Sequence, residues 1–280
     1  MKKYIILTDS STGYNEAQAK NHDIAFVPLT ITIDGKTIND DNKKISNQEF
    51  YELLKNDNKK IMTSQTPPGV LEEKFVTLLK EYEKVIFFPL SASLSGQYQT
   101  ALMLSNKEIF KDKVLIINSE SVSDVAKEMI KRSQEFLKTN KIADLPAFVN
   151  QLKKKYCAFI IPNNLKRLVI GGRISPAAAT LAGLLKIKPI LEFKGSIDKF
   201  DKTRTFKKAL KETLREIKKR FKDQTGNLSL VHSFCDEQLK ELTLQTISKE
   251  KFNISQISYL PSVIAAHTGY DTVVLIYWVK

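Results

Sequence analysis

The sequence has few of the residues from which disulfide frameworks and metal sites are built. Its 280 residues include two cysteines, Cys157 and Cys235, and three histidines. The two cysteines have no metal-binding spacing, and we expect them to be small buried side chains in a reducing compartment. No cluster of metal ligands occurs, so the sequence predicts neither a metal nor another cofactor.

Long apolar segments are also missing. The first residues reach Asp9 after only a few apolar positions, which is too short for a signal peptide. No segment approaches the length of a membrane-spanning helix. We therefore expect a cytoplasmic protein, and its 42% hydrophobic content is enough to bury one large core or two ordinary ones.

Several catalytic motifs are absent. There is no Gly-x-x-x-x-Gly-Lys-Ser/Thr loop for a nucleotide kinase, no dinucleotide fingerprint and no Gly-x-Ser-x-Gly elbow. The enzyme that stays open as an alternative is a serine-dependent hydrolase of an acyl or phosphoryl ester. It would use Ser95, His267 and Asp271.

The charge balance is strongly basic, with 44 Lys and Arg against 31 Asp and Glu and a net charge of +13. Such an excess can indicate nucleic-acid binding. Here the lysines are spread over the whole length, and no basic stretch is interleaved with aromatic residues for base stacking. We expect no nucleic-acid partner, whereas a transient contact with an anionic membrane surface or an acidic partner stays open.

The most informative stretch is a buried strand at 85–90 that leads into three serines, Gly96 and a helix starting at Gln97. The first N–H groups of a helix and its dipole favour an anion. The alternative is that Ser95 merely caps its own helix. The loop Asp9-Ser10-Ser11 follows an earlier strand in the same way, and there capping and turn formation are the favoured interpretation.

Three further features have polar groups suited to an anion. Residues 63–66 place three hydroxyls in four positions, although capping is the slightly favoured explanation for this stretch taken alone. Gly171-Gly172-Arg173 lets the backbone approach a ligand while presenting a guanidinium. His267 precedes a glycine, where we expect a loop. These groups suit a carboxylate or phosphate that is held rather than attacked.

The order of the predicted elements indicates an α/β protein with two domains. Strands alternate with helices up to residue 155, which predicts an N-terminal three-layer αβα domain (1–155) with a mainly parallel sheet. The pattern then changes and predicts a C-terminal α/β domain (156–280) with a mixed sheet. Ligands sit at the carboxyl ends of parallel strands, so we expect the loops after Leu7, after Leu90 and before Pro67 to share one rim.

Taken together, these motifs resemble the DegV family of bacterial fatty-acid-binding proteins, the carrier subunits that work with a fatty acid kinase. The resemblance extends from the first strand to the last. It rests on six motifs in this order: Asp9-Ser-Ser, Thr63-Ser-Gln, Ser93-Leu-Ser-Gly-Gln-Tyr98, Leu168 to Ser175, Ile187-Lys-Pro-Ile-Leu191 and His267-Thr-Gly269.

The resemblance implies one long-chain fatty acid bound between the two domains. Thr63 and Ser95 would bind the carboxylate, assisted by the Gly96 N–H, with Arg173 and His267 completing the polar network. The acyl tail would lie in an apolar tunnel lined in part by a helix from Ala177 to Leu185. The protein would be a carrier and not an enzyme, presenting the carboxylate to a separate kinase that forms an acyl-phosphate for phospholipid synthesis.

The resemblance also marks Arg204 as a possible kinase contact, although a surface arginine before a helix is the simpler interpretation. Two departures from the family pattern stand out. Val169-Ile170 replaces a basic approach to Gly171-Gly172-Arg173, and Tyr270-Asp271 replaces Pro-Gly after Gly269. Neither removes a proposed carboxylate partner.

Overall fold

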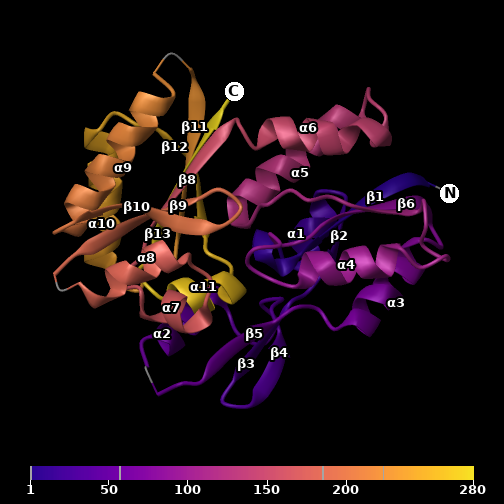
Figure 1. Ribbon diagram of the computed structural model, residues 1–280, viewed down its shortest axis with the longest axis horizontal. Coiled ribbons are helices and arrows are strands. Elements are labelled where there is room, and N and C mark those ends of the chain that lie inside the picture. Colours follow the sequence, from indigo (N-terminus) through magenta and orange to yellow (C-terminus); the bar gives the residue numbers. More distant parts are fainter. Residues whose placement is uncertain (1, 57, 185, 223) are drawn as a thin grey trace. The chain divides into compact units, whose positions relative to one another are not determined.

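The structure is a computed structural model that describes residues 2–56, 58–184, 186–222 and 224–280 (Figure 1). The chain forms two compact units from interleaved segments. The first unit contains the described residues of Met1–Ile45 and Lys60–Lys153, and the second those of Ser46–Lys59 and Lys154–Lys280. The domains 1–155 and 156–280 stay a prediction, because compactness alone does not show that a part folds by itself.

A four-stranded parallel sheet in the order β2-β1-β6-β7 forms the centre of the first unit. Its strands are β1 (Lys2–Asp9), β2 (Ile24–Val27), β6 (Tyr82–Phe88) and β7 (Val114–Ile116). The helices are α1 (Glu16–Asn21), α3 (Pro68–Leu78), α4 (Gln97–Ser105), α5 (Ser123–Leu137) and α6 (Leu145–Leu152), with single 3₁₀ turns η1 (Ser10–Thr12) and η2 (Ile142–Asp144). Helices α3 and α4 lie on one side of the sheet and α5 on the other, as the predicted three-layer arrangement requires (Figure 1).

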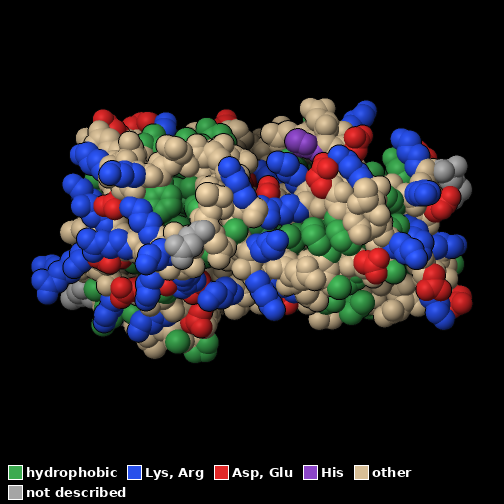
Figure 2. Space-filling view, turned by 90° about the horizontal axis from the view of Figure 1, so that it is seen from above, with side chains coloured by type: hydrophobic (Ala, Val, Ile, Leu, Met, Phe, Trp, Pro, Cys, Tyr) green, Lys and Arg blue, Asp and Glu red, His purple; other side chains and the backbone are tan. Residues whose placement is uncertain are grey.

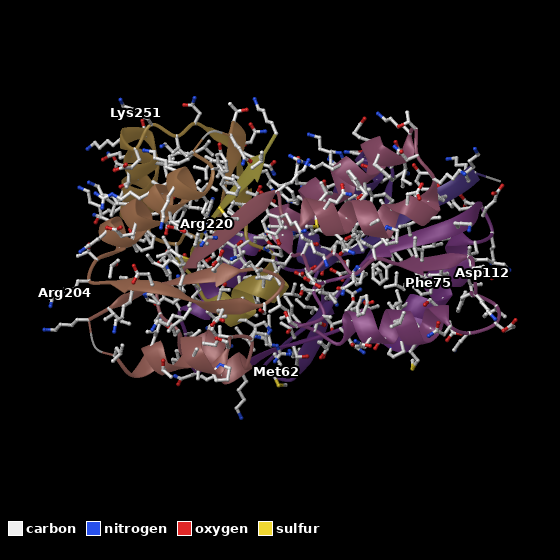
Figure 3. All side chains as sticks on the ribbon, turned by 45° about the horizontal axis from the view of Figure 1, so that its top comes forward. Met62, Phe75, Asp112, Arg204, Arg220 and Lys251 are labelled. Atoms are coloured by element: carbon white, nitrogen blue, oxygen red, sulfur yellow. The ribbon has the colours of Figure 1, made fainter. Side chains whose placement is uncertain are left out.

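Alternation along the strands explains this layering. Ile5 and Leu7 of β1 point to the same face of the sheet and pack with residues of α3 and α4 in one apolar cluster. Phe75 of α3 is the centre of that cluster, with its ring 6.0 Å from Phe87 and 5.6 Å from Phe110 in edge-to-face geometry (Figure 3). The hydrophobic runs that predicted buried strands therefore form the core of the first unit.

A small antiparallel sheet in the order β4-β3-β5 completes the first unit. Its strands are β3 (Thr30–Ile33), β4 (Lys36–Asn39) and β5 (Ile61–Ser64). Asp34-Gly35 forms the turn between β3 and β4, and both residues have the positive φ of a tight hairpin. Strand β5 differs from the expected loop, and it pairs Thr63 with Ile31.

A six-stranded mixed sheet in the order β10-β9-β8-β13-β11-β12 forms the second unit and confirms the predicted mixed sheet. Its strands are β8 (Tyr156–Ile161), β9 (Lys188–Phe193), β10 (Ile197–Thr203), β11 (Gly226–His232), β12 (Ile254–Tyr259) and β13 (Val273–Val279). The helices are α2 (Asn47–Leu54), α7 (Lys166–Gly171), α8 (Pro176–Ala179), α9 (Phe206–Arg220), α10 (Glu237–Lys249) and α11 (Ser262–Thr268), with the 3₁₀ turn η3 (Thr180–Gly183). Helices α9 and α10 pack side by side over one face of the sheet (Figure 1).

The helix expected from Ala177 to Leu185 is wrong as a single element. The chain forms only the one turn of α8 and then tightens into η3, while Leu185 lies outside the described residues. The Thr180 hydroxyl donates to the Ala177 carbonyl at 2.7 Å, which is a side-chain bond that competes with regular helix bonds.

Helix α2 belongs to the second unit although both of its neighbouring strands, β4 and β5, belong to the first. It begins with a capping box, in which the Glu49 N–H donates to Ser46 Oγ at 3.3 Å and the Ser46 N–H donates to Glu49 Oε2 at 2.9 Å. The Tyr51 hydroxyl donates to the Leu260 carbonyl, and Gln48 Nε2 donates to the Phe234 carbonyl at 3.3 Å. These bonds anchor α2 to residues about two hundred positions away in the sequence.

None of the helices formed by the described residues has both the length and the apolar character that a membrane span requires.

Candidate functional site

The first unit presents hydroxyl groups at the start of α4. Thr63 on β5 and Ser95 in the loop before α4 are both half-buried, and Gly96 is the N-cap residue. Among the described residues, no acceptor is bonded to the Gly96 N–H. This amide and the neighbouring Ser95 hydroxyl lie at the positive end of a nine-residue helix, which is an arrangement that favours an anion.

Ser95 also stabilises its own turn, as the capping alternative predicts. Its Oγ accepts the Gln97 N–H at 3.2 Å. This local bond does not prevent ligand binding, because a serine hydroxyl that accepts one bond still has a proton to donate.

Two glutamines that the sequence reasoning missed join the loop after β5 to the first turns of α4. Gln97 Oε1 accepts the Thr66 N–H at 3.0 Å, and Gln97 Nε2 donates to Thr66 Oγ1 at 3.0 Å. Gln65 Nε2 donates to Thr100 Oγ1 at 2.8 Å. A Cβ added to Gly96 would lie 2.6 Å from Gln65 Oε1, so glycine allows this close approach. The only sequence signal for these two glutamines is their position, since each is a polar residue just before or at the start of a helix.

Asp9 has a structural role. Its Oδ1 accepts the N–H and the hydroxyl of Ser11, and its Oδ2 accepts the Leu90 N–H at 2.8 Å. Burial raises the pKa of Asp9 to about 6, although the hydrogen bonds from Ser11 and Leu90 oppose the shift. Both oxygens are thus committed to capping η1 and to tying the ends of β1 and β6 together. The capping interpretation is confirmed.

The predicted rim of loops is confirmed within the first unit. The bond from the Leu90 N–H to Asp9 connects the loops that follow β1 and β6. The bonds between Gln97 and Thr66 connect the loop before Pro67 to the helix that follows β6. All three loops therefore meet at the carboxyl ends of the parallel strands.

The second unit brings the two glycines and Arg173 into a compact helix end. Gly172 has a φ of +62° and donates its N–H to the Val169 carbonyl at 3.0 Å, and the Arg173 N–H donates to the Leu168 carbonyl at 3.3 Å. This is a Schellman motif, which favours glycine at the left-handed position. The Arg173 guanidinium donates back to the Gly171 carbonyl, which holds the side chain beside the turn.

His267 packs against the same helix end. An added Cβ on Gly171 would lie 2.4 Å from Nδ1 of His267, so the imidazole occupies the space that a side chain would need. The expected loop is wrong here, because α11 continues through His267 to Thr268. Its C-cap is Gly269, which has a φ of +87° and donates its N–H to the Ala265 carbonyl at 2.7 Å. Gly171, Arg173 and His267 thus form one cluster.

The His267 imidazole is neutral at pH 7. Burial lowers its pKa to about 4, and the positive charges of Arg173 and Arg167 act in the same direction. Because the unfolded chain takes up a proton near pH 6.5 and the folded chain does not, this group costs stability as the pH falls from 6.5 towards 4. A neutral imidazole meets a carboxylate as a hydrogen-bond donor, and the arginines supply the positive charge.

Two other candidates lie in different settings. Arg204 precedes α9, is exposed and extends away from the ribbon of the second unit (Figure 3). Oδ1 of Asp271 accepts the N–H groups of Cys235 and Asp236 at 2.7 and 3.1 Å. Backbone donors therefore occupy that oxygen of Asp271. The charges that lower the pKa of His267 are those of Arg173 and Arg167, and Asp271 is not among them.

Within the described part of the chain, no three His, Cys, Asp or Glu side chains gather closely enough to hold a metal ion.

Comparison with known protein families decides the relationship. Residues 3–280 match the family described as "Uncharacterised protein, DegV family". The chain belongs to the DegV family. A DegV domain-containing protein of Mycoplasmopsis pulmonis is 30% identical, with 98% of this chain and 94% of that protein aligned. A second, from Halalkalibacterium halodurans, is 30% identical with both chains fully covered.

Solved structures of DegV proteins have the same fold. The DegV fatty-acid-binding protein of Bacillus subtilis is 26% identical with a TM-score of 0.82, and both chains are fully covered. A fatty-acid-binding DegV family protein of Streptococcus agalactiae is 25% identical with a TM-score of 0.86, also over both full chains. The resemblance inferred from the motifs is thereby confirmed, as is the α/β fold with a parallel and a mixed sheet.

Proposed function

We propose that this chain binds a long-chain fatty acid and carries it without catalysing a reaction of its own. The fatty-acid binding of the Bacillus subtilis and Streptococcus agalactiae DegV proteins supports this class of ligand. The observation on which the proposal mainly depends is the start of α4, where the Gly96 N–H and the Ser95 hydroxyl are neighbouring donors at the positive end of a helix. A single carboxylate matches such a pair.

In this proposal Thr63, Ser95 and the Gly96 N–H donate to the carboxylate, and Arg173 and His267 are further members of the polar network. The acyl tail is buried in apolar surroundings that include the segment of α8 and η3. Burial of the tail drives binding, since each CH₂ removed from water is worth about 0.8 kcal/mol.

Replacing Ser95 or Thr63 with alanine is expected to weaken fatty-acid binding about tenfold, because each change removes a hydrogen bond to a charged group worth about 1.5 kcal/mol. Native mass spectrometry of protein titrated with a panel of saturated and unsaturated fatty acids measures the bound fraction. The matched control is Ser93→Ala, an exposed hydroxyl in the same loop, which should bind as the unmodified protein does. Failure of the unmodified protein to hold any fatty acid would contradict the whole proposal.

We further propose that a separate fatty acid kinase phosphorylates the carboxylate in the cytoplasm, as a step towards phospholipid synthesis. Arg204 is the proposed kinase contact. Arg204→Ala is expected to lower the rate of acyl-phosphate formation by a purified fatty acid kinase while leaving fatty-acid affinity unchanged, because the side chain is exposed. Lys202→Ala removes another exposed charge two residues away and is the control. Equal rates of acyl-phosphate formation with the two variants would show that Arg204 is not part of the kinase contact.

A further inference from the structure

Helix α9 places an unusual concentration of positive charge on its solvent side. Between Phe206 and Arg220 it contains seven Lys and Arg residues and only two Glu. Its other side is apolar, and Phe206, Leu210, Leu214 and Ile217 pack into the core of the second unit. Figure 2 shows that Lys and Arg side chains are common over the visible face of the molecule. On α9 a basic stripe recurs at every fourth position: Lys207, Lys211, Arg215 and Lys219.

Most of this charge is not neutralised. The two glutamates are paired within the helix, Glu212 with Arg215 at 3.0 Å and Glu216 with Arg220 at 2.7 Å, and Lys218 lies 3.5 Å from Glu250. The remaining lysines of the helix have no carboxylate within 4.0 Å in the described part of the chain. They are Lys207, Lys208, Lys211 and Lys219.

The positive charges in the first turn and along the four-residue row are unfavourable for the isolated helix, whereas those in its last turn are favourable. Lys207 and Lys208 lie in the first turn, beside the positive end of the helix dipole, and no acidic residue offsets them there. Lys207, Lys211, Arg215 and Lys219 follow one another at intervals of four residues, which places like charges side by side. A negatively charged partner on this face would reverse both effects.

The surroundings of the stripe indicate what kind of partner fits. None of the described residues of α9 is an exposed large hydrophobic or aromatic side chain, so the face lacks the groups that enter a membrane or stack on bases. The row from Lys207 to Lys219 extends about 18 Å, with one charge per turn. Glutamates at every fourth position of another helix have the same spacing.

We propose that the solvent face of α9 is a docking surface for a protein that presents an acidic helix. The surface is defined by Lys207, Lys208, Lys211, Arg215 and Lys219. It contains none of the residues proposed to bind the carboxylate, and the inference does not depend on fatty-acid binding.

The test uses a helical peptide of alanine and glutamine with glutamate at every fourth position as the probe. Fluorescence anisotropy is expected to show binding at about 0.1 M salt and its loss at about 1 M, where the screening length falls to about 3 Å. The triple variant Lys207→Glu, Lys211→Glu, Lys219→Glu should weaken binding at least about tenfold. The control reverses three exposed lysines elsewhere in the second unit, with the same change in net charge: Lys249→Glu, Lys251→Glu, Lys280→Glu.

Equal losses in the two triple variants would show attraction to net charge and would overturn the proposal. So would peptide binding that is absent at the lower salt concentration. Binding of phosphatidylglycerol and phosphatidylcholine vesicles and of a short DNA duplex is measured in parallel. If vesicle or DNA binding depends on the α9 lysines and peptide binding does not, the face is assigned to a membrane or to nucleic acid. Fatty-acid binding by native mass spectrometry, which should stay unchanged, confirms that the variants are folded.

Discussion

Replacing Gly171 with alanine is expected to weaken fatty-acid binding by roughly 100-fold. The new methyl group would lie 2.4 Å from Nδ1 of His267, so the imidazole has to move. The Gly171 carbonyl also holds the Arg173 guanidinium. Loss of two polar contacts to a carboxylate costs about 3 kcal/mol, which corresponds to that factor in affinity. Titration followed by native mass spectrometry measures the affinity, and the NMR signal of the His267 ring reports its displacement.

Gly172→Ala provides the matched control, because nothing lies within 4 Å of a Cβ at that position. Its φ of +62° makes the change cost about 1–2 kcal/mol of stability without touching His267. Affinity should therefore be kept while the melting temperature falls. If the His267 signal shifts in the Gly171 variant and affinity does not, His267 is not a carboxylate ligand.

Replacing Arg220 with methionine is expected to lower the free energy of unfolding of the second unit by about 3 kcal/mol. Arg220 Nε donates to Glu216 at 2.7 Å, and its Nη atoms donate to both oxygens of Glu192. The guanidinium also lies 5.0 Å from the Phe159 ring centroid and 5.5 Å from that of Phe200. The network is mostly buried, with 14% of the Glu192 side chain exposed, so removal of the cation leaves two poorly solvated carboxylates.

Denaturant unfolding of three variants separates charge from packing. Arg220→Lys keeps the charge but loses the two-pronged geometry and the stacking, so an intermediate loss is expected. Glu192→Gln added to Arg220→Met removes one stranded carboxylate and should recover part of the stability. A loss of the same size in all three would show that the ion pairs contribute nothing beyond packing.

The free energy of unfolding should depend on pH through the Glu192 carboxylate. Burial alone would raise the pKa of Glu192, but the hydrogen bonds and charges of Arg220 and Lys194 hold it below its ordinary value of 4.5. The carboxylate therefore stabilises the folded state above pH 4.5, and this contribution is lost as the pH falls below that value. The Arg220→Met variant should show a smaller loss over the same range.

Local patterns in the sequence predicted most of the fold. The buried strand that leads into α4, the alternation of strands and helices up to residue 155 and the mixed sheet that follows are each present in the structure, and each is indicated by residues a few positions apart. Strand β5 was missed because four residues ahead of two prolines show too little alternation. The sequence does not predict the end of α11, because the glycine that follows His267 and Thr268 suggests a loop, whereas in the structure it is the C-cap of the helix.

The candidate site was only partly predictable for the same reason. The hydroxyls and the Gly-Gly-Arg turn are visible as local motifs. The contact of His267 with Gly171 joins residues 96 positions apart, and the bonds of Gln97 to Thr66 span 31. No spacing rule in a single sequence predicts such pairs, since they arise only when distant elements pack.

The assignment of α2 to the second unit bears on how this protein can be divided by genetic means. A gene fragment that stops at residue 155 would encode α2 but not Leu260 or Phe234, to which Tyr51 and Gln48 donate. Such a truncated product would expose Phe50, Tyr51 and Leu54 to water and so favour aggregation. An exchange of the second unit between relatives would have to transfer residues 46–59 together with residues 154–280, because both segments belong to that unit.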